Sequence, residues 1–300
     1  MADRRDPFPT EEGRLALLLM APAGFVVLGL AIYPIVDVLW LSLHRKMLIF
    51  DISGFVGLEN YARLLGDARF WNSFFNTFYF TAVSVSIELL LGLLIALALH
   101  RAFPGRGMMR AVVLIPWAVP TVVSAKMWQW IYNPDFGVLN YLLRECGVIS
   151  ANVNWLGHKY IAIHAVILAD VWKTTPFMAL LLLAGLQVIP QDLYKAAMVD
   201  GAGAWRRFRH ITLPLLRPAI LIALLFRTLD AFRMFDTVYV LTGGGPGDRT
   251  ETLSVYAYKL MFQTLQFGYG SAVSVITFVC VLLISVLYIR LLGGHMRLGT

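Results

Sequence analysis

The chain has 300 residues, of which 59% are hydrophobic and only 14% charged, whereas a soluble domain carries about 25% charged residues. The apolar residues form long uninterrupted runs instead of recurring at the period of an amphipathic helix or strand. This pattern excludes an ordinary soluble globular protein. The net charge of +7 fits basic loops beside a membrane as well as it fits nucleic acid. With this apolar background we expect no nucleic-acid partner.

Six apolar segments are each long enough to cross a bilayer. A helix rises about 1.5 Å per residue, so a hydrocarbon core of about 30 Å requires about 20 apolar residues. The spans are expected at Leu15 to Leu43, Asn72 to Leu99, Ala111 to Ile131, Tyr160 to Leu186, Pro218 to Leu241 and Gly268 to Leu292. The first is too long for a cleavable signal, whose apolar region has about 7 to 15 residues. The predicted fold is therefore all-α, a polytopic membrane protein with about six transmembrane helices.

The placement of lysine and arginine predicts the orientation. Residues 1–14, 100–110, 187–217 and 290–300 carry these residues at about twice the density of the other connecting segments, as expected of cytoplasmic segments. Both termini are therefore expected in the cytoplasm, with an N-terminal segment at 1–14, a transmembrane domain at 15–292 and a C-terminal tail at 293–300. Arg45 and Lys46 run against this pattern, because they lie just outside the first span.

The third and fourth spans contain prolines, which membrane helices often tolerate, and a pair of charges. Prolines that favour kinks occur at Pro116, Pro120 and Pro176. Asp170 and Lys173 are three residues apart in the fourth span, on either side of Trp172, and can pair on one helix face. The pair could be structural, or it could line a path for a polar solute.

The segment between the fourth and fifth spans predicts a helical hairpin. Pro190 suits the first turn of a helix, and the sequence from Asp200 to Gly203 breaks that helix because glycine permits a tight left-handed turn. A second short helix is expected to carry Trp205, Phe208 and Ile211 on roughly one side and to end at Pro214. On its residue pattern alone, an amphipathic helix resting on anionic lipid remains an equal alternative.

The motif in this segment resembles a known family. "AAMVDGAGAWRRFRHITLP" is similar to the EAA loop of permeases in binding-protein-dependent ABC importers, in which Ala-Ala, Asp-Gly-Ala and Ile-x-Leu-Pro recur in this order. "VWKTTPFMALLLLAGLQVIP", "LLFRTLDAFRMFDTVYVLTGGGPG" and "YPIVDVLWLSL" resemble the sugar permeases of maltose, glycerol-phosphate and trehalose type. The resemblance covers about Leu15 to Leu292. One departure is Lys195, which stands where the family usually has glutamate.

The resemblance implies a type I ABC importer permease of the bacterial inner membrane that pairs with a second, homologous permease. Two ATP-binding subunits would bind the loop at 187–217, and an extracytoplasmic sugar-binding protein would deliver a disaccharide, trehalose or a related sugar. No cofactor is expected on this chain, since ATP and Mg would be bound by the partner ATPase. The residues expected to couple to the ATPase through 190–214 are Ala196, Ala197, Asp200, Gly201, Ala202, Phe208, Ile211, Leu213 and Pro214. Ala197, Gly201 and Phe208 are expected at the core of that contact.

The predicted fifth span contains a ladder of charges. Arg227, Asp230, Arg233 and Asp236 alternate in sign at intervals of three, and four unpaired charges in lipid would cost on the order of 10 kcal/mol. The span must therefore lie inside the bundle or along a wet cavity. The ladder could be structural, or it could bind sugar hydroxyls while an aromatic ring stacks on the sugar. The candidates for the substrate path are Asp170, Trp172, Lys173, Arg227, Asp230, Arg233, Phe235, Asp236 and Tyr239.

Several motifs of other functions are missing from the sequence. There is no phosphate-binding G-x-x-x-x-G-K-[ST], no H-E-x-x-H and no G-x-S-x-G. We therefore expect a transport subunit and not an enzyme, with no catalytic and no metal-binding residues. The alternatives are a self-contained secondary transporter and a membrane scaffold without a substrate path.

Overall fold

The structure is a computed structural model that describes residues 11–296. The expected N-terminal segment at 1–14 and tail at 293–300 fall partly outside these residues. The last helix, α14, continues through Met296.

Five helical segments are long and apolar enough to cross a membrane. They are Gly13–Ser42, Ala68–His100, Ala162–Val188, Ala204–Phe232 and Phe267–Leu291. The first comprises α1 (Glu11–Val27), a π-helical turn and α2 (Tyr33–Ser42). The second, third and fifth are α4 (Ala68–His100), α8 (Ala162–Val188) and α14 (Phe267–Met296). The fourth joins α10 (Ala204–Arg207), a π-helical turn at Phe208–Thr212 and α11 (Leu213–Phe232).

The third predicted span is broken instead of kinked. α5 (Arg106–Ala118) and α6 (Thr121–Ile131) meet at 88°. Val119, between them, has extended backbone angles, as the ring of a following proline imposes. Pro120 therefore ends one helix and caps the next. Counted as one span, the pair makes six spans in the described residues, and the all-α membrane fold is confirmed.

The fifth span ends earlier than the sequence suggested. The expectation was a continuous helix to Leu241, but α11 ends at Phe232 and a separate α12 covers Asp236–Thr242. The charged ladder therefore does not wind around one helix. Arg233 caps α11 and Asp236 begins α12, so the last two charges lie at a break in the chain.

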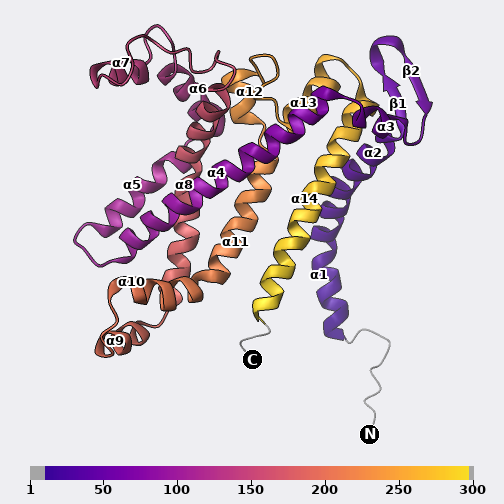
Figure 1. The fold of residues 1–300 in the computed structure, drawn as a ribbon. Helices are drawn as coiled ribbons and strands as arrows, with labels where there is room; N and C mark the ends of the chain where they lie inside the picture. The colour runs from indigo at the N-terminus through magenta and orange to yellow at the C-terminus, as the bar shows by residue number, and fades with distance from the viewer. Residues whose placement is uncertain (1–10, 297–300) are drawn as a thin grey trace.

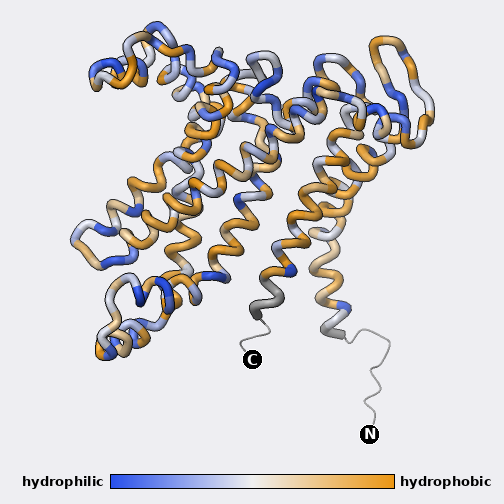
Figure 2. The backbone as a smooth tube through the Cα atoms, viewed as in Figure 1, coloured by the Kyte–Doolittle hydropathy of each residue, from blue (hydrophilic) through white to orange (hydrophobic). Residues whose placement is uncertain are grey.

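The helices form a bundle with two distinct ends (Figure 1). One end holds α9 and α10 together with the start of α1 and the end of α14. The opposite end holds the shorter elements: an antiparallel hairpin of β1 (His44–Met47) and β2 (Ile52–Phe55), α3 (Glu59–Leu65), α7 (Val138–Glu145), α12 and α13 (Leu253–Tyr258). Hydrophobic residues dominate the lengths between the ends (Figure 2).

α4, α8 and α11 pack on one another and surround the largest core. At Gly92 of α4, an added Cβ would lie 2.7 Å from the Cγ of Met178 on α8. A small residue is therefore required there for close approach of the two helices, as is common between membrane helices. This tight pairing fixes the position of the polar groups carried by the same helices.

Candidate substrate cavity and coupling hairpin

A buried arginine joins three helices in the middle of the bundle. Arg227 of α11 is 1% exposed and forms ion pairs with Glu88 of α4 and Asp170 of α8, both equally buried. Its Nη2 donates to Glu88 Oε1 at 2.9 Å and its Nε donates to the other oxygen of the same carboxylate. Its Nη1 donates to Asp230 Oδ2 at 3.0 Å. The guanidinium thus uses its rigid fork of donors on three carboxylates.

This arrangement explains how charges persist among apolar helices. A buried charge costs several kcal/mol unless it is paired and hydrogen-bonded. Thr174 adds a further hydrogen bond to Glu88, of 2.9 Å. Asp170 Oδ2 accepts from Arg227, while its Oδ1 is buried without a hydrogen-bond partner. One acceptor of the cluster is therefore left free.

Glu88 is not among the site residues expected from the sequence. This carboxylate is fully buried, and it lies within the 33-residue apolar helix α4. A lone carboxylate in such a run was itself a signal, because it demands a cationic partner inside the bundle. Which cation it would meet, 139 positions away, was not readable from the sequence.

A polar cavity of about 380 Å³ opens beside this cluster. It is lined by Trp117, Thr121, Asp170, Lys173, Thr174, Asp230, Arg233, Met234, Phe235 and Asp236. Residues of α5, α6, α8, α11 and the α11–α12 break contribute to the lining. The cavity brings together six of the nine residues nominated for a substrate path, which are Asp170, Lys173, Asp230, Arg233, Phe235 and Asp236.

The other three nominated residues lie elsewhere. Arg227 is buried among the carboxylates and does not line the cavity. Trp172 lies edge-on to Trp128, with 5.8 Å between ring centres. Tyr239 is stacked on Phe235 at 5.1 Å and an interplanar angle of 15°, so that face of Phe235 is already covered.

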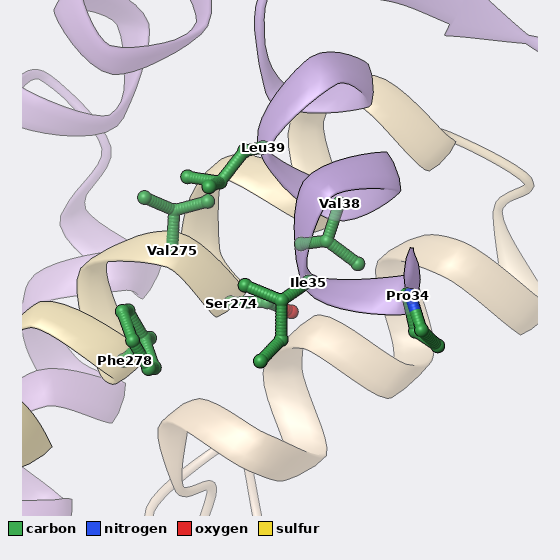
Figure 3. A pocket seen from close by; sticks show the side chains of 7 residues that line it. All are labelled: Pro34, Ile35, Val38, Leu39, Ser274, Val275 and Phe278. Atoms are coloured by element: carbon green, nitrogen blue, oxygen red, sulfur yellow. The ribbon is translucent and has the colours of Figure 1, made fainter. Parts of the chain in front are cut away.

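The cavity's chemistry suits a solute with many hydroxyl groups. Its carboxylates accept hydrogen bonds, and Lys173 and Arg233 donate them. Trp117 and Phe235 add aromatic surface to the lining. By contrast, the groove between α2 and α14, lined by Pro34, Ile35, Val38, Leu39, Ser274, Val275 and Phe278, offers mainly hydrocarbon (Figure 3).

The second site is the hairpin between α8 and α11. α9 (Gln191–Val199) begins after Pro190, and the chain turns at Gly201, whose φ is +75°. The predicted first helix and glycine turn are present. The predicted end at Pro214 is wrong, because the helix runs from α10 through the π-helical turn at Phe208–Thr212 into α11, in which Pro214 is the second residue. The second arm of the hairpin therefore continues without interruption into the transmembrane helix.

Three of the nine nominated coupling residues are exposed on this hairpin. Ala196, Asp200 and Gly201 are exposed, and the rest are partly buried: Ala197, Ala202, Phe208, Ile211, Leu213 and Pro214. Trp205 is 70% exposed and stacks on Phe208, with ring centres 5.5 Å apart. A large exposed aromatic of this kind is typical of an interface with a partner.

The two arms of the hairpin are held to one another. The hydroxyl groups of Tyr194 and Thr212 are 3.0 Å apart and connect α9 to the π-helical turn. A groove of about 620 Å³ separates the hairpin from the end of α4, and Leu94, Leu97, Trp205 and Phe208 are among its lining residues. Within residues 11–296, no cluster of His, Cys, Asp and Glu side chains could hold a metal ion.

Together the bundle, the internal polar cavity and the hairpin at one end define a polytopic membrane permease. The family of binding-protein-dependent transport system inner membrane components matches residues 88–296. The chain belongs to this family. It is thus a transport component of the inner membrane and not an enzyme, and the reading as an ABC importer permease is supported over the secondary transporter.

The relatives and solved structures agree. The trehalose/maltose transport system permease protein MalF of Thermococcus litoralis is 50% identical over 93% of this chain and 94% of its own length. The trehalose transport system permease protein SugA of Mycobacterium tuberculosis is 46% identical over 94% of this chain and 90% of its own. A bacterial ABC transporter for alginate import is 22% identical, with a TM-score of 0.82 over 95% of this chain and 96% of its own, which shows the shared fold.

Proposed function

We propose that this chain forms half of the translocation path of an ATP-driven importer for a disaccharide of the trehalose or maltose type. The observation that carries the proposal is the internal cavity, in which carboxylates, two cations and aromatic rings face a space of about 380 Å³. The names of the two relatives, trehalose/maltose and trehalose permeases, support the choice of sugar. This chain supplies only half of the path, because a second, homologous permease would pair with it and close the open side of the cavity.

The proposal includes a coupling role for the hairpin at 190–214. Its exposed Trp205 and small residues such as Ala196 offer an apolar surface to a cleft on an ATPase, a helix-in-groove contact. Two such ATP-binding subunits would carry ATP and Mg. The hairpin lies at the same end of the bundle as the start of α1 and the end of α14, and we place this end in the cytoplasm on the positive-inside pattern.

The opposite end would receive a sugar-binding protein. A solved relative of the same fold is the alginate transporter in complex with an alginate pentasaccharide-bound periplasmic protein. In this chain that end carries α7, α12, α13 and the β1–β2 hairpin, which together give it a broad surface outside the apolar spans.

Reconstituted uptake tests the proposal. The chain, its partner permease, the ATPase and the binding protein are assembled in liposomes and offered a panel of labelled sugars with and without ATP. We expect uptake of a disaccharide that requires ATP and copurification of a nucleotide-binding subunit. Uptake driven by an ion gradient alone would overturn the proposal. A cysteine at position 205 should be labelled from the cytoplasmic side only.

A further inference from the structure

We propose that Glu88 is a positioning residue for transport: through Arg227 it holds the carboxylate of Asp170 with one oxygen free for a hydroxyl group of the sugar. This inference rests on the proposed function and adds to it a residue that does not itself line the cavity. Its basis is the pattern of hydrogen bonds among Glu88, Arg227 and Asp170.

Glu88 fixes the guanidinium of Arg227 in rotation as well as in position. Both carboxylate oxygens of Glu88 accept from Arg227, one from Nε and one from Nη2. A bidentate contact of this kind defines the plane of the guanidinium, which a single hydrogen bond would not. Thr174 in turn donates to Glu88 and fixes that carboxylate.

The remaining donors of Arg227 then determine how the two cavity carboxylates lie. Nη2 donates to Asp170 Oδ2 and Nη1 donates to Asp230 Oδ2. Because Arg227 reaches only one oxygen of Asp170, the other is not used by the protein. A buried oxygen without a donor is rare and costly, which is understandable if a bound molecule supplies the donor.

The residue that carries this oxygen lines the cavity, and the oxygen itself is buried. Asp170 is 1% exposed and lines the polar cavity together with Thr174, Lys173 and Asp230. A sugar hydroxyl could donate to Asp170 while accepting from Lys173, the pattern by which sites distinguish a hydroxyl from a hydrocarbon. Without Glu88, Arg227 would be free to turn and use both oxygens of Asp170, and the acceptor would be lost.

The test is the number of sugars transported per ATP hydrolysed by the reconstituted importer. Glu88→Gln keeps the shape of the side chain but loses its charge and one acceptor oxygen. We expect transport per ATP to fall at least about tenfold, the effect of losing one hydrogen bond to a charged group. Normalisation to assembled complex separates this from a loss of folded protein, which would lower transport and hydrolysis together.

A matched control is available beside the start of α4, just before α13. Glu251 is also fully buried, and it pairs with Arg69 and Lys259, each at 2.7 Å, away from the cavity. Glu251→Gln makes the same chemical change, so it should lower the yield of complex and leave transport per ATP unchanged. If both variants lower the ratio equally, Glu88 has only a structural role.

A double-mutant cycle with Asp170→Asn completes the test. If Glu88 acts through Asp170, the double variant should transport no worse than Asp170→Asn alone, whereas independent roles would give multiplied losses. If Glu88→Gln does not assemble, Glu88→Asp replaces it in the cycle. Its loss of transport per ATP should likewise disappear when Asp170 is already replaced by Asn. A wild-type ratio in every Glu88 variant overturns the inference. Absence of sugar uptake by the unmodified importer would instead overturn the proposed function.

Discussion

Arg227 of α11 and Glu88 of α4 are 139 residues apart in sequence and share two hydrogen bonds in a contact that excludes solvent. Each makes the other's charge tolerable, because an ion pair in a bilayer protein replaces the water that its members have lost. The bond therefore has a structural consequence that is separate from any role in transport.

The structural consequence predicts a strong effect of Arg227→Gln. This change leaves Glu88 and Asp170 buried without their cation, and removing one member of a buried pair costs about 3–5 kcal/mol. We expect a large loss of folded protein, measured as thermal unfolding in detergent. Arg233→Gln is the control, because Arg233 is exposed and its side chain donates to the Leu229 carbonyl at 3.2 Å. The free energy of unfolding of Arg233→Gln should stay within about 0.5 kcal/mol of that of the wild type.

The glycine turn of the hairpin gives a second prediction. Gly201 has φ of +75° with no atom near an added Cβ, so Gly201→Ala carries only the backbone cost of a left-handed conformation, about 1–2 kcal/mol. We expect weaker binding of the ATPase and less sugar-stimulated ATP hydrolysis. Gly203→Ala tests the assignment, since Gly203 has φ of −65° and equal space. If Gly201→Ala and Gly203→Ala lose ATPase binding and ATP hydrolysis to the same extent, the left-handed turn has no specific role.

Lys195 provides a third prediction. It pairs with Asp192 at 2.9 Å, but both side chains are largely exposed, and such a surface pair contributes at most about 1 kcal/mol. Lys195→Glu should therefore leave the folded permease stable while reversing the charge offered to the ATPase. We expect Lys195→Glu to bind the ATPase more weakly than the unmodified permease does at low salt, and the two affinities to differ less at high salt. Titration of the ATPase onto the purified permease measures both. The affinity of Lys195→Ala for the ATPase should lie between the affinities of the unmodified permease and of Lys195→Glu.

A fourth prediction concerns acid stability at the end of the bundle opposite the hairpin. Burial acts to raise the pKa of Asp67, but hydrogen bonds from the hydroxyls of Tyr256 and Tyr269 and from the backbone of Arg69 and Phe70 outweigh it and lower the pKa. A lowered pKa means that the carboxylate stabilises the fold above the unfolded value of about 3.9 and loses this effect as the pH falls.

Thermal unfolding between pH 6 and pH 3 checks this. The unmodified protein should be more stable than Asp67→Asn at pH 6, and the difference should shrink below about pH 4. The comparison with the variant removes the contribution of other carboxylates. A difference that stays constant across this range would show that the negative charge of Asp67 does not contribute.

The number of spans and the hairpin were predictable because each depends on local sequence. Long apolar runs specify helices in lipid whatever they pack against, and Asp200-Gly201 ends α9 by its own backbone preference. The β1–β2 hairpin and the helix end at Phe232 were not foreseen. Phe235 and Tyr239 are apolar enough to extend a span in sequence, but in the fold they stack beside a break.

Six of the residues that line the cavity were nominated from the sequence, but the contacts between helices were not. Spacing suggested pairs within one helix, such as Asp170 with Lys173, yet the ion pair that Asp170 forms is with Arg227 on another helix. Contacts between helices depend on rotation and depth, which a periodic pattern leaves open. Arg227 and Asp230 form a pair along one helix that the spacing of the charges suggested and the structure contains.

The helical segment from Ala204 to Phe232, which includes the π-helical turn at Phe208–Thr212, carries both the second arm of the hairpin and the arginine of the charge cluster. Ala204 and Arg227 lie about 35 Å apart along it, at about 1.5 Å per residue. A tilt of about 5° around one of these points displaces the other by about 3 Å, roughly the length of a hydrogen bond. A small tilt at the membrane surface therefore reaches the arginine that joins α4 and α8 as a displacement of this size, provided that the π-helical turn at Phe208–Thr212 moves with the rest of the helix.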